Sequence, residues 1–228
     1  MTYALAWKSK KEVFLAADTA ITSSSDVPLN LELEMSSFGQ THFIDESHKK
    51  KVEERATKLF LKKNIGITFA GNYELAIEVV STFYKKISSG VGINDALKDA
   101  LFLHSVDSVD KLQLIIGYYE GNPKLLSFNA DYDLKIKEEF GVVQIGAPLK
   151  DHRQLTESWI KDFVSESNPN LQLVDVLSIL QSYNLFSPQM SRGIGGAFCG
   201  LYVGNNCQSW QPDILYADYG IDDGKIIG

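Results

Sequence analysis

The order in which apolar periodicities follow one another is the feature that most constrains the fold of this chain. Short alternating or continuous apolar runs, typical of strands, occupy the beginning, the middle and the end of the sequence. Two blocks between them place apolar residues three and four positions apart, which is typical of helices. Segregated blocks favour the α+β class with antiparallel sheets over alternating βαβ units. We therefore predict two antiparallel sheets packed face to face and flanked by helix pairs, a four-layer αββα sandwich.

The opening of the chain predicts two pairs of strands. Residues 2–8 and 12–17 are apolar runs, and the polar tripeptide 9–11 between them suits a hairpin turn. Residues 57–61 and 65–69 form the second pair. Both pairs contain enough apolar residues to bury at least one face of a sheet.

The segment that separates these two pairs is polar and rich in serine. Residues 19–55 carry no sustained period, apart from a short strand expected within 41–44. Such a length is unusual for a loop in a compact domain. We interpret about 23–55 as a long inserted loop. Because no internal repeat or linker divides the chain, we expect a single domain over residues 1–228.

The two helical blocks have recognisable ends. The first comprises helices expected over 72–90 and 93–104, and the second comprises helices with apolar positions at Leu155, Trp159 and Phe163 and at Leu173, Val176, Leu177 and Leu180. Asn72 is the expected N-cap of the first helix and Gly90 its end, while Asn94 and Asp95 are expected to cap the second. The remaining strands are expected at 112–118, 124–128, 134–136, 142–145, 195–203 and 209–217.

Composition and charge exclude several classes of function. The net charge of −7 argues against a nucleic-acid-binding face, which is normally basic. No run approaches the roughly 18 to 20 apolar residues that span a bilayer, and early lysines interrupt any signal-peptide core. We therefore expect a cytoplasmic protein that binds neither nucleic acid nor membrane. The four histidines lack metal-ligand spacing, so we expect no metal site and no cofactor.

The N-terminus carries the candidate chemistry, since the GxSxG elbow, the P-loop and the Rossmann glycine fingerprint are absent. Thr2 starts the first strand and Asp18 ends the second. This hairpin resembles the first hairpin of proteasome β subunits and their bacterial relatives, which are N-terminal-nucleophile hydrolases, and the spacing of the two residues matches that family. Downstream, the surroundings of Lys58 and Gly71 resemble the segments that carry the family's lysine and oxyanion-hole glycine. The resemblance follows the whole chain in element order but is tight only over residues 2–71.

The resemblance implies a role for each of these residues. Thr2 becomes the nucleophile once Met1 is removed, because a free α-amine can then act as its base. Lys58 lowers the pKa of that amine, Asp18 holds Lys58, and the Gly71 N–H stabilises the oxyanion.

The family also suggests how a substrate is bound and with what the protein assembles. The backbone at Thr22 and Gly71 binds an extended peptide as an added strand, and Phe69 and Tyr73 shape an apolar side-chain pocket. The expected substrate is a peptide or an unfolded protein. The expected assembly is a homo-oligomeric ring with an unfoldase as a possible partner.

Three positions depart from the family pattern. The family places a serine after the glycine near the nucleophile, where this chain has Ala147. A late aspartate and hydroxyl correspond here to Ser191, a weaker supporting residue, and Ile194. These departures leave alternatives to a threonine peptidase or amidase open: a catalytically inactive structural subunit of the same fold, or an amidase for a small molecule that forms no ring.

Overall fold

The computed structural model describes most of the chain. The described residues are 2–24, 42–45, 49–54, 57–105, 109, 111–129, 135–163, 168–186, 192–205, 207–210, 220–222 and 225–227. Within them, the strands form two five-stranded sheets, one three-stranded sheet and one two-stranded sheet, and every recorded strand pair is antiparallel. The α+β class with antiparallel sheets, predicted from the block order, is confirmed.

The first five-stranded sheet, which we call the N-terminal sheet, has the order β11-β1-β2-β12-β13. Its strands are β1 (Tyr3–Lys8), β2 (Glu12–Asp18), β11 (Val143–Gly146), β12 (Phe198–Gly204) and β13 (Cys207–Trp210). The predicted turn between β1 and β2 is present: the Ser9 N–H donates to the Glu12 carbonyl at 2.9 Å, and the Ser9 hydroxyl donates to the Glu12 carboxylate at 2.7 Å.

The second five-stranded sheet, which we call the second sheet, has the order β10-β9-β8-β7-β6. Its strands are β6 (Leu59–Lys62), β7 (Ile65–Gly71), β8 (Leu112–Tyr119), β9 (Pro123–Asn129) and β10 (Ile136–Glu138). The two sheets share a buried apolar cluster that includes Leu15 and Ile115. Gly66 permits their close approach, because a Cβ there would lie 2.7 Å from Leu201 Cδ1 and 2.9 Å from Leu15 Cδ1.

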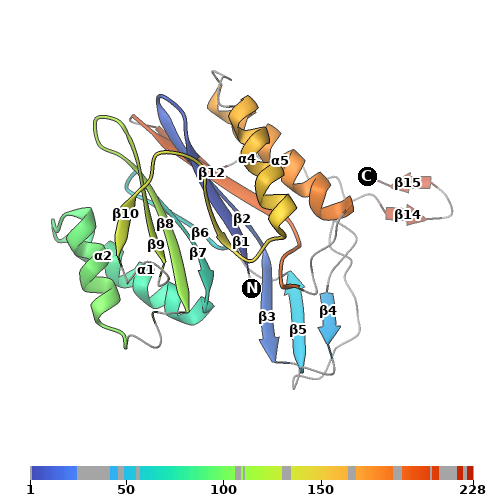
Figure 1. Ribbon diagram of the computed structural model, residues 1–228, viewed down its shortest axis with the longest axis horizontal. Helices are drawn as coiled ribbons and strands as arrows, with labels where there is room; N and C mark the ends of the chain where they lie inside the picture. The colour runs from blue at the N-terminus through green and yellow to red at the C-terminus, as the bar shows by residue number, and fades with distance from the viewer. Residues whose placement is uncertain are drawn as a thin grey trace.

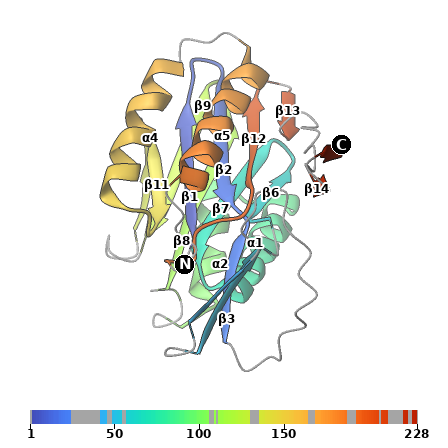
Figure 2. The same ribbon diagram turned by 90° about the vertical axis from the view of Figure 1, so that its right-hand side faces the viewer.

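Four helices in the described chain cover the outer faces of the two sheets in pairs (Figures 1 and 2). Helices α1 (Tyr73–Ser88) and α2 (Ile93–Phe102) pack on the second sheet through one apolar cluster. Helices α4 (Lys150–Phe163) and α5 (Pro169–Phe186) pack on the N-terminal sheet through another. The described residues include no helix long and apolar enough to span a membrane.

Helix α1 begins as predicted, but the predicted start of α2 is wrong. The Asn72 side chain accepts a hydrogen bond from the Leu75 N–H at 3.0 Å and caps α1. Helix α2 instead has Gly92 at its N-cap with no side-chain cap bond, and Asn94 and Asp95 lie inside its first turn. There Asp95 still faces the positive end of the helix dipole, which explains its compatibility with this position.

The buried face of α4 also differs from the predicted one. Leu155 is 40% exposed, whereas His152, Thr156 and Ile160 are buried. The His152 ring stacks on Tyr183 at 4.1 Å between centroids and meets the edge of Tyr3 at 4.8 Å. The histidine faces inward because aromatic side chains from β1 and α5 contact it, which the periodicity of apolar residues cannot indicate. In α5, the four predicted apolar positions are all buried.

The segment predicted as a long loop contains more regular structure than expected. Strands β3 (Ala20–Ser24), β5 (Lys50–Glu54) and β4 (His42–Asp45) form a three-stranded sheet in that order, which projects from the body of the molecule in Figure 1. The expected strand at 41–44 corresponds to β4, while the sequence pattern does not indicate β3 or β5. Residues 25–41 lie outside the described residues. A further hairpin, β14 (Gly220–Asp222) with β15 (Lys225–Ile227), lies near the C-terminus.

Candidate functional site

A buried ion pair joins the end of β2 to the start of β6. Lys58 Nζ lies 2.6 Å from Asp18 Oδ1, and the two side chains are 2% and 0% exposed. Asp18 reaches this position as the last residue of β2, and Lys58 directly precedes β6. Residues forty positions apart in the chain are therefore in direct contact, as the family resemblance implies.

The Asp18 carboxylate accepts two further hydrogen bonds, both from backbone groups. The Tyr3 N–H donates to Oδ1 at 3.1 Å, and the Gly195 N–H donates to Oδ2 at 3.0 Å. Gly195 is held in turn, because its carbonyl accepts from the Ala20 N–H at 3.1 Å. Asp18 thus ties together the peptide group that follows Thr2, the buried lysine and the loop before β12.

Burial and pairing act in opposite directions on both members of this pair. Burial lowers the pKa of the Lys58 ammonium below its ordinary value, and the neighbouring Asp18 carboxylate opposes that shift. Burial raises the pKa of the Asp18 carboxyl, and Lys58 and the two N–H donors oppose it. A buried lysine whose pKa is shifted by burial and by a specific carboxylate partner is a candidate functional residue.

Thr2 is 3% exposed and lines a cavity of about 240 Å³. The other residues that line it are Ala70, Gly71, Lys111, Gln113, Gly146 and Ala147. Gly71 adopts φ +112°, and a Cβ there would lie 1.8 Å from the Lys111 carbonyl oxygen. This position at the end of β7 therefore requires glycine for both conformation and space. The cavity brings the threonine and this glycine together.

On the other side of Thr2, the chain is held by backbone hydrogen bonds at the end of β11. The Ala147 N–H donates to the Thr2 carbonyl at 3.1 Å. Gly146 has φ +87°, and a Cβ there would lie 1.7 Å from the Thr2 carbonyl oxygen. The Gly146 N–H donates to Gln113 Oε1 at 2.7 Å, and its carbonyl accepts from Arg153 Nη2 at 2.6 Å.

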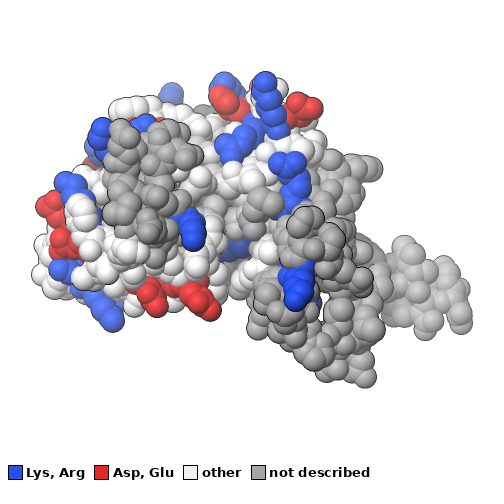
Figure 3. Space-filling model, turned by 60° about the horizontal axis from the view of Figure 1, so that its bottom comes forward, with Lys and Arg blue, Asp and Glu red and all other residues white. Residues whose placement is uncertain are grey.

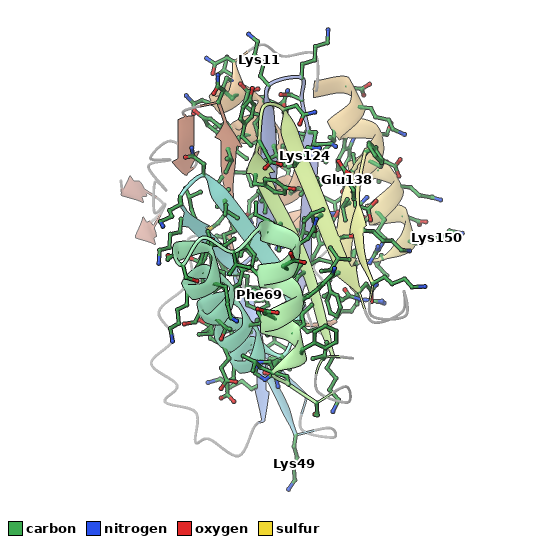
Figure 4. The ribbon with its side chains drawn as sticks, turned by 90° about the vertical axis from the view of Figure 1, so that its left-hand side faces the viewer. Lys11, Lys49, Phe69, Lys124, Glu138 and Lys150 are labelled. Carbon is green, nitrogen blue, oxygen red and sulfur yellow. The ribbon has the colours of Figure 1, made fainter. Side chains whose placement is uncertain are left out.

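The predicted substrate-binding residues lie in two places. Thr22 lies in β3 and pairs with Val52 of β5. Phe69 is buried beneath α1 and α2 (Figure 4), with its ring 5.8 Å from Tyr73 and 6.0 Å from Phe60. None of these residues is among those that line the cavity at Thr2.

The positions that depart from the family pattern are accounted for in different ways. Ala147 lines the cavity and contributes its backbone N–H to Thr2. Ile194 is fully buried in the apolar cluster beneath α4 and α5. Met1 and Ser191 lie outside the described residues.

Three residues of this site are not expected from the sequence: Gln113, Arg153 and Gly195. Gln113 is a polar residue within an otherwise apolar strand, a signal that is present in the pattern of 112–118. Arg153 donates to a backbone carbonyl and Gly195 donates through its backbone N–H. The spacing of residue types along the sequence indicates neither contact.

Lys or Arg and Asp or Glu side chains both occur on the face in Figure 3. Among the described residues, no group of three His, Cys, Asp or Glu side chains is arranged to hold a metal ion.

Comparison with solved structures shows a shared fold. A mutant of Anbu from Hyphomicrobium sp. strain MC1 matches with a TM-score of 0.58 and 18% identity, covering 95% of this chain and 90% of that one. Anbu in another crystal form matches with a TM-score of 0.55 and 17% identity, over 93% and 88% of the two chains. HslV from Trypanosoma brucei matches with a TM-score of 0.51 and 15% identity, over 90% and 100%.

No protein-family model matches the sequence, and no curated protein does. Anbu and HslV are both proteasome-type N-terminal-nucleophile hydrolases. At identities this low the likeness concerns the course of the backbone and not the chemistry. The chain therefore has the fold of the proteasome-type N-terminal-nucleophile hydrolases.

Proposed function

We propose that this protein is a threonine-type peptidase or amidase that uses Thr2 as its nucleophile after removal of Met1. The observation that carries the proposal is the buried Asp18 carboxylate, which binds both Lys58 and the peptide N–H that follows Thr2. A buried ion pair is weak support for stability, because desolvation offsets its attraction. The Asp18 carboxylate accepts from the peptide N–H that joins Tyr3 to Thr2, and Thr2 lines a cavity with Gly71, which supports a catalytic purpose for the pair.

The reaction begins when the Thr2 hydroxyl attacks the carbonyl carbon of a bound peptide. The free α-amine, whose reference pKa is about 7.7 to 8.0, takes the hydroxyl proton. The nearby Lys58 cation disfavours a second positive charge and lowers the pKa of the amine, so that more of it is unprotonated at neutral pH. The Gly71 N–H donates to the oxyanion of the tetrahedral intermediate.

Collapse of this intermediate breaks the peptide bond. The α-ammonium returns its proton to the leaving amine, and an ester between Thr2 and the acyl group remains. Water then attacks the ester with the amine again acting as base, which releases the acid and restores the hydroxyl. Asp18 stays in place throughout and orients Lys58.

The finer features of the architecture are part of the same proposal. We infer a single domain over residues 1–228, in which the two sheets and two helix pairs form the four-layer αββα sandwich. The substrate is a peptide or unfolded protein bound along Thr22 and Gly71, with Tyr73 at its side-chain pocket and the buried ring of Phe69 packed against Tyr73. The protein assembles into a homo-oligomeric ring in the cytoplasm, with an unfoldase as a candidate partner.

A second candidate function is an inactive structural subunit of the same fold. Two observations favour it: Ala147 has no hydroxyl to offer beside Thr2, and Ile194 is buried among apolar side chains. Such a subunit retains Met1 and assembles without hydrolysing anything.

Intact mass spectrometry after incubation with an electrophile directed at N-terminal threonine separates the two candidates. The peptidase loses Met1 and gains the mass of one inhibitor on Thr2. Thr2→Ser retains a hydroxyl and is labelled, whereas Thr2→Ala is not. An unlabelled wild-type protein that retains Met1 supports the structural subunit instead.

A further inference from the structure

Gln113 connects the two sheets at the cavity beside Thr2. It lies in β8 of the second sheet, opposite Ala70 of β7, whereas its hydrogen-bond partner Gly146 ends β11 of the N-terminal sheet. The bond from the Gly146 N–H to Gln113 Oε1 is 2.7 Å long. Because the N–H group needs an acceptor and the amide nitrogen of glutamine is not one, this bond fixes which end of the amide faces Gly146.

The group that Gln113 holds is itself rigid and in contact with Thr2. The Gly146 carbonyl accepts from Arg153 Nη2 at 2.6 Å, so that both polar groups of this residue are engaged by side chains from other elements. The next residue, Ala147, donates its N–H to the Thr2 carbonyl. Because the Gln113 side chain is anchored to this backbone group, it loses little further conformational entropy when it binds a substrate.

The other end of the Gln113 amide is available. A primary amide has two N–H donors on nitrogen in addition to its carbonyl acceptor. Within the described part of the chain, Gln113 Nε2 donates no hydrogen bond, although the residue lines the cavity together with Thr2. Apart from Gln113, Thr2 and Lys111, the described residues that line this cavity are alanine or glycine.

The position of the cavity indicates which part of a substrate reaches Gln113. In the proposed function, the acyl part of the peptide lies along Thr22 of β3 and Gly71. Among the residues whose side chains the structure describes, none in β3 lines the cavity, whose lining includes Gly71, Thr2, Gly146 and Ala147. Gln113 thus shares this cavity with Gly146 and Ala147 and not with Thr22, along which the acyl part is placed, which assigns Gln113 to the leaving-group part of the peptide.

We propose that Gln113 is a substrate-contacting residue whose Nε2–H donates to a carbonyl oxygen of the leaving-group part of a peptide. This inference rests on the proposed function and identifies a determinant of leaving-group preference. The hydrogen bond from the Gly146 N–H fixes the position of Oε1 and thereby orients the Nε2–H donor. Substrates with a peptide leaving group gain this hydrogen bond, whereas an arylamine leaving group without a carbonyl does not.

The test compares two reporters that share one acyl part, the first with a peptide leaving group and the second with a carbonyl-free arylamine. Gln113→Glu keeps an acceptor for the Gly146 N–H but removes the donor, and Gln113→Met removes both. For each variant, kcat/KM is measured on both reporters. We expect Gln113→Glu to lower the ratio of kcat/KM on the peptide reporter to kcat/KM on the arylamide roughly 3- to 10-fold, as for the loss of one neutral hydrogen bond.

The ratio of the two rates within one variant does not depend on how much protein is folded, so Gln113→Met carries the test if the Glu variant is unstable. An unchanged ratio in both variants overturns the role of Gln113. If the wild-type protein cleaves neither reporter and is not labelled at Thr2, the proposed function fails instead. The two failures are therefore distinguishable.

Discussion

The two sides of Thr2 are built from different kinds of group. On one side, the charged side chains of Asp18 and Lys58 meet in a buried ion pair that also binds the Tyr3 N–H. On the other side, the backbone of Gly146 and Ala147 holds the Thr2 carbonyl, and side chains from other elements hold that backbone. The charged side follows the family spacing, whereas the backbone side includes Ala147, a departure from it.

The contrast shows that a backbone hydrogen bond holds Thr2 at a position where the family pattern places a hydroxyl. A backbone N–H needs no particular side chain at its own position, but it does require that the strand end be fixed. Here, Gln113 and Arg153 fix it from the second sheet and from α4. Substitutions can perturb each side separately.

Removal of the buried cation is expected to have the largest effect. Lys58→Met leaves the Asp18 carboxylate buried without its ion-pair partner, which typically costs about 3 to 5 kcal/mol of unfolding free energy. Labelling of Thr2 is expected to be lost as well. Urea denaturation measures the first effect and mass spectrometry the second.

The matched control is Lys63→Met in the exposed turn between β6 and β7, which is expected to change stability by less than about 0.5 kcal/mol. The double variant Asp18→Asn with Lys58→Met is expected to regain stability but not labelling. If the double variant is labelled as fast as wild type, the ion pair is structural only.

Gly71→Ala is expected to rank next. The left-handed φ costs of order 1 to 3 kcal/mol for a residue with a Cβ, and the contact with the Lys111 carbonyl adds to that cost. Gly90→Ala is the control, because Gly90 also has a positive φ, +89°, but a Cβ there would meet no atom within 4 Å. A similar loss of unfolding free energy in both variants would contradict a specific requirement for space at Gly71.

Arg153→Met perturbs the backbone side of Thr2. It removes the hydrogen bonds from Arg153 to the Gln144 and Gly146 carbonyls and is expected to cost about 1 to 3 kcal/mol. The rate of Thr2 labelling should fall while the Asp18–Lys58 pair stays intact. Lys161→Met on the exposed face of α4 is the control. If Arg153→Met is labelled at the wild-type rate, the hydrogen bonds of Arg153 at the end of β11 do not affect the reactivity of Thr2.

Protonation of His152 is expected to have the smallest effect on labelling of Thr2, because His152 is not among the described residues that line the cavity at Thr2. Burial lowers the pKa of His152 from 6.5 to about 4, so the unfolded chain binds a proton that the folded chain does not between these values. Stability contributed by neutral His152 is therefore complete above pH 6.5 and is lost as the pH falls toward 4. Thermal unfolding of wild type and His152→Phe over this range should show a shallower slope for the variant. Parallel slopes would assign the acid sensitivity to other groups.

Much of the fold can be predicted from sequence because strands and amphipathic helices have distinct periods. The block order, the first hairpin, the cap of α1 at Asn72 and the apolar face of α5 all follow from these patterns. The buried face of α4 does not, because His152 and Thr156 are polar and the burial of His152 depends on aromatic rings from other elements. Strands β3 and β5 could not be predicted, because their residues are mostly polar and do not alternate between apolar and polar.

For the site, the placement of Asp18 against Lys58 follows from the family resemblance, as does Gly71 beside Thr2. The contribution of Gly195 does not, since it is made by a backbone N–H, which the residue type does not indicate. Gln113 is visible as a polar residue in an apolar strand, but its partner Gly146 lies in the other sheet. Contacts between sheets follow from tertiary structure and not from local spacing.

The most direct test of the central claim is the intact mass of the purified protein with and without an electrophile directed at N-terminal threonine. We expect a protein that lacks Met1 and gains one inhibitor mass, localised by fragmentation to Thr2. We also expect that Lys58→Met and Thr2→Ala gain none. A wild-type protein that lacks Met1, is folded and remains unlabelled would contradict the assignment of Thr2 as the nucleophile.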